Sequence, residues 1–252
     1  MEKRALVTGA SEGIGNTFAR RLAQDGFIVT AVARNESKLK ELIKQLGEKH
    51  RYLVADLSTD AGQRAIAKEV ENQHYNLLIN NAGVGVQGQF AESSIDKQLA
   101  MVRLNCEAVV VLSHSFLNQA KKGDALVNVS SALAFNPFPN MGLYAATKAF
   151  VTSFSESLWY EQKERGVFVM DFCPGITSTN FQVSAGGKME DLPKNLAQTP
   201  ETVVDNALKA LAHRQRPTVV SGVKNLIFAS MFRVMPRKSL VKMMGKMAEG
   251  RK

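Results

Sequence analysis

A glycine-rich turn, Thr8-Gly9-Ala10-Ser11-Glu12-Gly13-Ile14-Gly15, joins the apolar run Ala5-Leu6-Val7 to a helical pattern that begins at Asn16. Glycine lets the backbone turn tightly and approach a ligand closely. The start of a helix presents unpaired N–H groups and the positive end of the helix dipole, which suit a pyrophosphate. The spacing is neither G-x-G-x-x-G nor a P-loop, so this segment by itself also fits a plain tight turn. Because strand, turn and helix follow in order, we interpret it as a phosphate-binding turn formed by Gly9, Ser11, Gly13, Ile14 and Gly15.

Short apolar runs alternate with amphipathic helical patterns along most of the chain. The runs that indicate strands are residues 5–7, 27–32, 52–55, 77–79, 125–129, 167–170 and 218–220, and helical patterns include 16–24, 37–46 and 62–70. Continuously apolar strands are typical of a sheet that is covered on both faces. The alternation predicts the α/β class, a doubly wound parallel sheet of the Rossmann type in three layers. We expect one domain over residues 1–222, followed by a helical tail over 223–252.

The residue after the second predicted strand bears on cofactor choice. An acid at the strand end holds the ribose of NAD, whereas an arginine there can hold the 2′-phosphate of NADP. Here Ala33 ends the strand and Arg34 follows, while Ser11 adds a hydroxyl donor in the glycine turn. The sequence therefore favours NADP(H), with a solvated arginine at a helix start as the alternative.

Tyr144 and Lys148 are four residues apart, which places them on one helix face one turn apart. A nearby cation favours a phenolate, so we expect Lys148 to lower the pKa of Tyr144 toward working pH. Such a phenol can protonate a carbonyl oxygen. Upstream, the strand 125–129 leads into Ser130 and Ser131, where a hydroxyl can hold a substrate oxygen. An ordinary exposed pair is the alternative for Tyr144 and Lys148.

Taken together, these segments resemble the short-chain dehydrogenase/reductase family from Ala5 to about Val220. The order and spacing of the matching motifs are specific, and the catalytic set shows no departure. The motifs are Thr8-Gly9 with Gly13-Ile14-Gly15, Asp56-Leu57, Asn80-Asn81-Ala82-Gly83, Asn105, Ser131, Tyr144 with Lys148, and Pro174-Gly175-Ile176-Thr177-Ser178-Thr179.

The resemblance implies catalytic roles for four residues. Tyr144 would be the general acid in reduction and the base in oxidation. Lys148 would lower its pKa and bind the nicotinamide ribose, and Ser131 would orient the carbonyl. Asn105 would hold a water that relays protons to Lys148. From the residues alone, Asn105 fits a buried, hydrogen-bonded polar side chain equally well.

The resemblance also implies further cofactor contacts. Asp56 and Leu57 would flank the adenine, and Asn81, Ala82 and Gly83 would line the cofactor beside the fourth strand. The segment from Pro174 through Gly175 and Thr177 to Thr179 would cover the nicotinamide, with Thr179 on its carboxamide or on the phosphates.

Two segments are expected to shape the substrate pocket. Residues 132–141 are apolar and stiffened by Pro137 and Pro139, which favours an apolar ketone, aldehyde or acyl-chain carbonyl, although the phenylalanines there also suit a core. Residues 182–198 contain Gly186-Gly187 and mixed charge, so we expect a mobile lid that closes over substrate.

The composition excludes several classes of protein. A 252-residue chain that is 45% hydrophobic is not a mostly disordered one. Its two cysteines, Cys106 and Cys173, do not make a disulfide scaffold, and its four histidines show no metal-binding spacing, so we expect no metal. No apolar run reaches the roughly 18 residues of a membrane span, and no apolar signal core precedes the first strand. We expect a cytoplasmic protein.

The net charge of +9 belongs to the tail. Residues 214–252 hold ten Lys or Arg and one acid, whereas residues 1–213 hold 22 of each sign. The domain itself therefore gives no reason to expect specific nucleic-acid binding. A basic tail can contact phospholipid, nucleic acid or an acidic partner, or form a solvated basic helix face.

Apolar residues recur at helical spacing on both sides of Pro236. Basic amphipathic helices of this kind can lie on anionic membranes or present a soft, methionine-rich face to a partner. The alternative is packing on the protein's own domain or on a second subunit. The apolar positions are Leu226, Ile227, Met231, Val234 and Met235, then Leu240, Val241, Met243, Met244 and Met247.

The sequence thus predicts an NADPH-dependent carbonyl reductase that transfers a hydride to a small-molecule substrate, the carbonyl of an apolar ketone, aldehyde or acyl chain, with proton delivery from Tyr144. The alternatives are a non-catalytic dinucleotide-binding regulator and an NAD-linked alcohol dehydrogenase. The family resemblance implies a homo-oligomer, a dimer or a tetramer.

Overall fold

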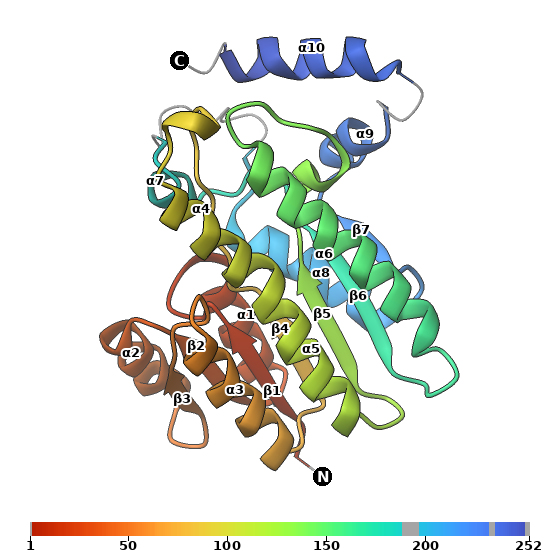
Figure 1. The fold of residues 1–252 in the computed structure, drawn as a ribbon. Coiled ribbons are helices and arrows are strands. Elements are labelled where there is room, and N and C mark those ends of the chain that lie inside the picture. The colour runs from red at the N-terminus through yellow and green to blue at the C-terminus, as the bar shows by residue number, and fades with distance from the viewer. Residues whose placement is uncertain (1, 188–196, 232–234, 250–252) are drawn as a thin grey trace.

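The computed structural model describes residues 2–187, 197–231 and 235–249. Its centre is a seven-stranded sheet in the order β3-β2-β1-β4-β5-β6-β7, in which every neighbouring pair is parallel (Figure 1). The predicted doubly wound parallel sheet is therefore confirmed. The strands are β1 (Arg4–Thr8), β2 (Ile28–Ala33), β3 (Arg51–Val54), β4 (Leu77–Asn80), β5 (Ala125–Val129), β6 (Phe168–Cys173) and β7 (Thr218–Val220).

Helices cover both faces of this sheet (Figure 1). Phe18 and Leu39 belong to the apolar core on one face, and Ile66 and Leu112 to the core on the other; all four are buried. The first face carries α1 (Gly13–Gln24), α2 (Glu36–Leu46) and α8 (Pro200–His213), and the second carries α3 (Asp60–Asn72), α5 (Ala108–Gln119) and α6 (Gly142–Glu161). Shorter elements are η1 (Phe90–Glu92), α4 (Ile95–Val102), η2 (Arg103–Glu107), η3 (Ala132–Phe135) and α7 (Phe181–Ser184).

Three helices begin at capping side chains that the sequence supplies. Asn35 accepts a hydrogen bond from the Lys38 amide at the start of α2, and Thr59 accepts one from the Gly62 amide at the start of α3. Thr199 does the same for α8, which has Pro200 in its first turn. Such caps satisfy amides that a helix start leaves without partners.

The strand order reverses at the centre of the sheet. β1 pairs with β2 on one side and with β4 on the other, so the chain leaves β1 and β4 in opposite directions. In open α/β sheets the crevice at such a reversal, beyond the carboxyl ends of the strands, is where ligands bind. The glycine turn that follows β1 and the residues that follow β4 meet there.

One helical stretch among the described residues, Ile95–Gln119, is long and apolar enough by composition to cross a membrane, with a hydropathy of 1.3. The sequence-based expectation considered only uninterrupted apolar runs, so it did not register this stretch. Half of it is buried inside the protein, and its α5 part packs against α3. A core helix passes the same test.

The tail forms α9 (Val223–Met231) and α10 (Arg237–Glu249), and α10 lies across the end of the molecule toward which the strands run (Figure 1). Leu240, Met244 and Ala248 of α10 are buried against the domain. The tail thus packs on its own domain, which was one of the two alternatives. Val234 lies outside the described residues.

Candidate active site

A cavity of about 650 Å³ lies at the carboxyl ends of the central strands. It extends from the glycine turn after β1 to Tyr144 on α6, so it joins the two motifs on which the sequence interpretation depends. Of the predicted site residues, Gly15 and Asn105 do not line it. Those that do are Gly9, Ser11, Gly13, Ile14, Arg34, Asp56, Leu57, Asn81, Ala82, Gly83, Ser131, Tyr144, Lys148, Pro174, Gly175, Thr177 and Thr179.

The glycine turn needs its glycines for two different reasons. Gly9 and Gly13 have φ of +67° and +58°, in the left-handed region that side chains disfavour. A Cβ at Gly15 would collide with the Gly9 carbonyl oxygen and with Nδ2 of Asn81. Gly15 therefore lets α1 pack closely on the turn, while Gly9 and Gly13 shape the surface of the cavity.

Thr8 and Asn81 hold the turn against the end of β4. The Thr8 hydroxyl accepts hydrogen bonds from the amides of Asn81 (3.0 Å) and Ala82 (2.9 Å), and it donates to the Ile79 carbonyl (3.3 Å). Nδ2 of Asn81 donates to the Thr8 carbonyl at 2.9 Å. These bonds fix the phosphate end of the cavity from two strands at once.

Charged side chains gather where the adenosine end of a dinucleotide would lie. Nη1 of Arg34 is 3.7 Å from Oδ2 of Asp56, and 66% of the Arg34 side chain is exposed. Lys38, one turn further along, also lines the cavity and pairs with Glu12 at 2.6 Å. Burial alone would raise the pKa of Asp56, but hydrogen bonds from Ser58 and the charge of Arg34 hold it below its ordinary value.

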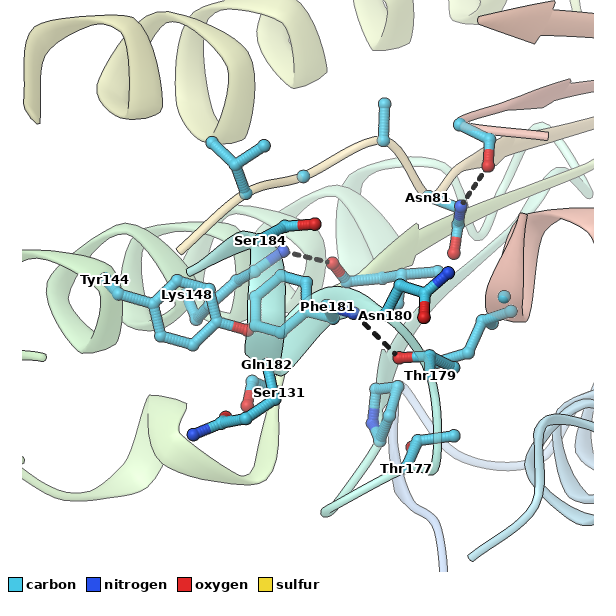
Figure 2. Close-up of a pocket in the computed structure, with 18 of the residues that line it drawn as sticks. Asn81, Ser131, Tyr144, Lys148, Thr177, Thr179, Asn180, Phe181, Gln182 and Ser184 are labelled. Carbon is cyan, nitrogen blue, oxygen red and sulfur yellow. Dashed lines mark hydrogen bonds between the residues drawn. The ribbon is translucent and has the colours of Figure 1, made fainter. Parts of the chain in front are cut away.

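Tyr144, Lys148 and Ser131 meet at the other end of the cavity (Figure 2). Tyr144 and Lys148 are 6% and 4% exposed. Nζ of Lys148 lies 5.8 Å from the centre of the Tyr144 ring and donates to the Val129 carbonyl at 2.9 Å. Ser131 follows β5, and its hydroxyl accepts a hydrogen bond from the Leu133 amide at 3.2 Å.

The predicted lowering of the Tyr144 pKa is wrong in this structure. Burial raises the pKa of Tyr144 to about 12, although a side-chain hydrogen bond with Ser131 opposes the rise. Burial also lowers the pKa of Lys148 to about 8, against the charges of Cys106, Asp171 and Cys173. Desolvation thus decides the direction of both pKa shifts, because both groups are taken out of water.

Asn105 lies in η2 and is fully buried. Its Oδ1 accepts from the Val84 amide (3.0 Å), and its Nδ2 donates to the Val84 carbonyl (2.9 Å) and to Oγ1 of Thr147 (3.0 Å). It thereby ties the segment after β4 to α6. This is the buried, hydrogen-bonded role that the residues alone allowed; the water relay stays a prediction.

The segment after β6 folds over the glycine turn. A Cβ at Gly13 would lie 3.2 Å from Cγ2 of Thr179, and the Thr179 hydroxyl accepts from the Phe181 amide at 3.3 Å (Figure 2). The Phe181 ring centre is 5.6 Å from that of Tyr144. Of the predicted lid, residues 188–196 lie outside the described residues.

Several residues that line the cavity were missed from the sequence. Lys38 lies four residues after Arg34 in the first turn of α2, and that proximity was an available signal. Phe181 follows the recognised segment directly. Phe228 and Met247 come from the tail helices, and no local pattern connects them with a site formed more than 80 residues earlier by Tyr144.

The residues fit a nicotinamide dinucleotide. Left-handed glycines at the start of α1 leave room for phosphates, and the helix N-terminus supplies amides and a favourable dipole there. The cavity continues from this turn to Tyr144 and Lys148, so one elongated molecule can occupy both ends.

The chain belongs to the short-chain dehydrogenase/reductase family. The family model described as "short chain dehydrogenase" matches residues 3–190. Members of this family are oxidoreductases that act on carbonyl or alcohol groups with a nicotinamide dinucleotide.

Several curated relatives are similar over most of this chain. The very-long-chain 3-oxoacyl-CoA reductase of Rattus norvegicus is 30% identical over 246 residues, 92% of this chain and 75% of that protein. The hydroxysteroid dehydrogenase-like protein 1 of Gallus gallus is 31% identical over 187 residues, 70% of this chain but 56% of that protein. The human counterpart, "inactive hydroxysteroid dehydrogenase-like protein 1", is 29% identical, over 85% of this chain and 67% of its own length.

Solved structures match the fold closely. A short-chain dehydrogenase from Sphingobium yanoikuyae in complex with NADPH has a TM-score of 0.84 and 28% identity, over 95% of each chain. The bulky-bulky ketone specific alcohol dehydrogenase from Comamonas testosteroni has a TM-score of 0.76 and 26% identity, over 96% of this chain and 91% of that one.

Proposed function

We propose that this chain is an NADPH-dependent reductase of an apolar ketone, aldehyde or acyl-chain carbonyl. The observation that carries the proposal is the buried phenol of Tyr144, whose pKa of about 12 keeps it protonated at neutral pH. It stands at the end of a cavity lined there by Leu133 and Phe138. A protonated phenol beside an apolar wall suits proton donation to an uncharged carbonyl compound.

Each polar side chain at this end has a step to perform. A bound nicotinamide dinucleotide supplies the hydride in reduction and accepts it in oxidation. Tyr144 donates its phenolic proton to the substrate oxygen, and the Ser131 hydroxyl orients that oxygen by a hydrogen bond. The Lys148 ammonium, held by the Val129 carbonyl, stabilises the phenolate that remains. Phe181 shields the phenol from water.

The preference for NADPH over NADH is supported by two cations, Arg34 and Lys38, that line the cavity with Ser11. The similar Sphingobium structure holds NADPH. Charge-assisted hydrogen bonds contribute about 1.5–3 kcal/mol each, so Arg34→Ala should weaken NADPH binding about 10–100-fold and leave NADH binding nearly unchanged. Lys40→Ala is the matched control, because Lys40 is a nearby cation on α2 that does not line the cavity.

Measured kcat/KM with the two cofactors decides this point. We expect wild-type protein to use NADPH at least tenfold better. Equal or better turnover with NADH would replace the proposal with the NAD-linked alcohol dehydrogenase.

A non-catalytic regulator is the second candidate, favoured by the name of the human relative, which is called inactive. A screen of NADPH consumption against a panel of ketones and aldehydes separates the two. Turnover of any of them supports the enzyme, whereas NADPH binding without turnover of any panel member favours the regulator.

A further inference from the structure

The inner face of α10 and the phenol of Tyr144 belong to one apolar cluster. Leu240, Met244 and Ala248, spaced four residues apart, are 2%, 0% and 7% exposed. They pack in the same cluster as Phe138 and Tyr144. The last helix is therefore packed on the chemical end of the cavity.

The tail helices also contribute directly to the wall of the cavity. Phe228 of α9 and Met247 of α10 line it. α9 sits against the segment that covers the cavity, since a Cβ at Gly175 would collide with the side chain of Asn225. Nδ2 of Asn225 donates to the Ser221 carbonyl at 2.6 Å, which fixes the start of α9.

The wall is mainly apolar around Tyr144, although Gln182 and, on α9, Lys224 and Asn225 also line the cavity. The acids that line the cavity among the described residues, Glu12 and Asp56, lie at its opposite end beside Lys38 and Arg34. An apolar substituent is stabilised when it leaves water and contacts the apolar side chains of this wall. The residues of the wall are Leu133, Phe138, Met141, Phe181, Phe228 and Met247.

We propose that α9 and α10 form the outer wall of the substrate site, and that Met247 contacts the far end of a long or bulky apolar substituent on the carbonyl carbon. This inference rests on the proposed function and narrows it. The substrates are carbonyl compounds whose substituent reaches from Tyr144 to α10, and small ketones leave this wall unused.

Two substitutions on α10 form a matched pair. Met247 and Val241 are 41% and 42% exposed on the same helix, but only Met247 lines the cavity. Met247→Glu therefore places a carboxylate at the substrate wall, and Val241→Glu places the same charge outside it. Because both side chains are already partly in solvent, neither change buries a charge in the core.

The affinity of methyl ketones of increasing length, from 2-butanone to 2-dodecanone, is measured by calorimetric titration. The full-length protein is first saturated with a non-reactive NADPH analogue. Each methylene that leaves water should tighten wild-type binding by about fourfold. Met247→Glu should weaken binding of the longest ketone at least tenfold and leave 2-butanone unchanged. Val241→Glu should match wild type with both.

Three outcomes would overturn the inference: no gain with chain length in wild type, equal long-chain affinity in Met247→Glu, or the same loss in Val241→Glu. Turnover with NADPH is measured separately on the same ketones. Binding of long ketones without turnover would refute the proposed reductase activity and support the substrate wall. Turnover without dependence on chain length would support the reductase activity and refute the substrate wall.

Discussion

Substitution of Tyr144 tests the proposed chemistry most directly. Its hydroxyl is the proton donor, so Tyr144→Phe removes the donor and keeps the buried ring and its packing on Phe181. Loss of a positioned acid costs about 10²–10⁴ in rate. We expect kcat to fall by that factor while the dissociation constant for NADPH stays within about threefold of wild type. Tyr160→Phe, at a tyrosine that is 73% exposed, is the control. Turnover of Tyr144→Phe near wild type would refute the assignment.

The raised pKa of Tyr144 predicts different pH profiles for reduction and for oxidation. Reduction needs the phenol, which a pKa of about 12 keeps protonated, so kcat/KM for reduction should be flat between about pH 6 and 7, below the pKa of about 8 at which Lys148 loses its charge. Oxidation needs the phenolate, whose fraction rises about tenfold per pH unit below the pKa. We therefore expect kcat/KM for alcohol oxidation to rise steeply from about pH 6 to 7, where Lys148 is still charged, measured under saturating oxidised cofactor. A flat pH profile for alcohol oxidation would contradict the raised pKa of Tyr144.

At this scale the sequence predicted which side chains meet, but not their energetics. The spacing of Tyr144 and Lys148 places them on one helix face, and the structure brings them to one cavity end. Spacing carries no information on burial, which depends on residues such as Phe138 and Met244 that pack in the same cluster. For that reason the direction of the Tyr144 pKa was predicted wrongly.

The Thr8 hydroxyl joins the end of β1 to the residues that follow β4. Thr8→Val keeps the shape of the side chain but leaves the amides of Asn81 and Ala82 without their acceptor. An unsatisfied amide costs about 1–3 kcal/mol when it is buried, and these two amides are partly buried. We expect the free energy of unfolding to fall by roughly 2–4 kcal/mol in chemical denaturation and NADPH binding to weaken. Thr8→Ser, which keeps the hydroxyl, should lose much less; equal losses in both variants would show that the hydrogen bonds contribute little.

Elements were predictable where their pattern is local. Each predicted strand appears within two or three residues of its expected bounds, because continuous apolar runs such as residues 125–129 need no distant partner to be recognised. The π-helical segment η2 was not predictable, since Asn105 owes its position to hydrogen bonds with Val84 and Thr147. Gly15 was placed in the cofactor site by its motif, although its constraint is packing against Gly9.

For the whole molecule, the sequence patterns did not decide whether the tail packs on its own domain or contacts a membrane or partner. The helical spacing of Leu240 and Met244 predicted an amphipathic helix but did not say what covers its apolar face. The covering residues, Met101 and Phe138, lie more than 100 positions earlier in the chain. Only the tertiary arrangement shows that this face is used inside the protein, which leaves the opposite face of α10 to meet anything outside it.

That opposite face is a row of lysines. Lys238, Lys242 and Lys246 are exposed and recur every four residues, offset by two positions from the buried Leu240 and its row. Two residues correspond to about 200° of helix, so the two rows lie on opposite sides. Among the described residues none of these lysines forms an ion pair. We predict that this lysine row binds anionic phospholipid surfaces, since each lysine near such a surface contributes about 1 kcal/mol.

Sedimentation with vesicles tests this contact in the full-length protein. Three lysines should give about a hundredfold stronger association with phosphatidylserine-containing vesicles than with pure phosphatidylcholine, weakening as salt is raised. Replacing Lys238, Lys242 and Lys246 with glutamine should remove the difference. The same replacement at the exposed lysines 44, 49 and 68 changes the net charge equally but away from α10, and should not. If both triple variants sediment alike, binding follows the net charge and the lysine row has no special role. If the wild-type protein shows no preference for anionic lipid, the lysine row does not bind membranes, and the function of α10 is confined to the cavity that it covers.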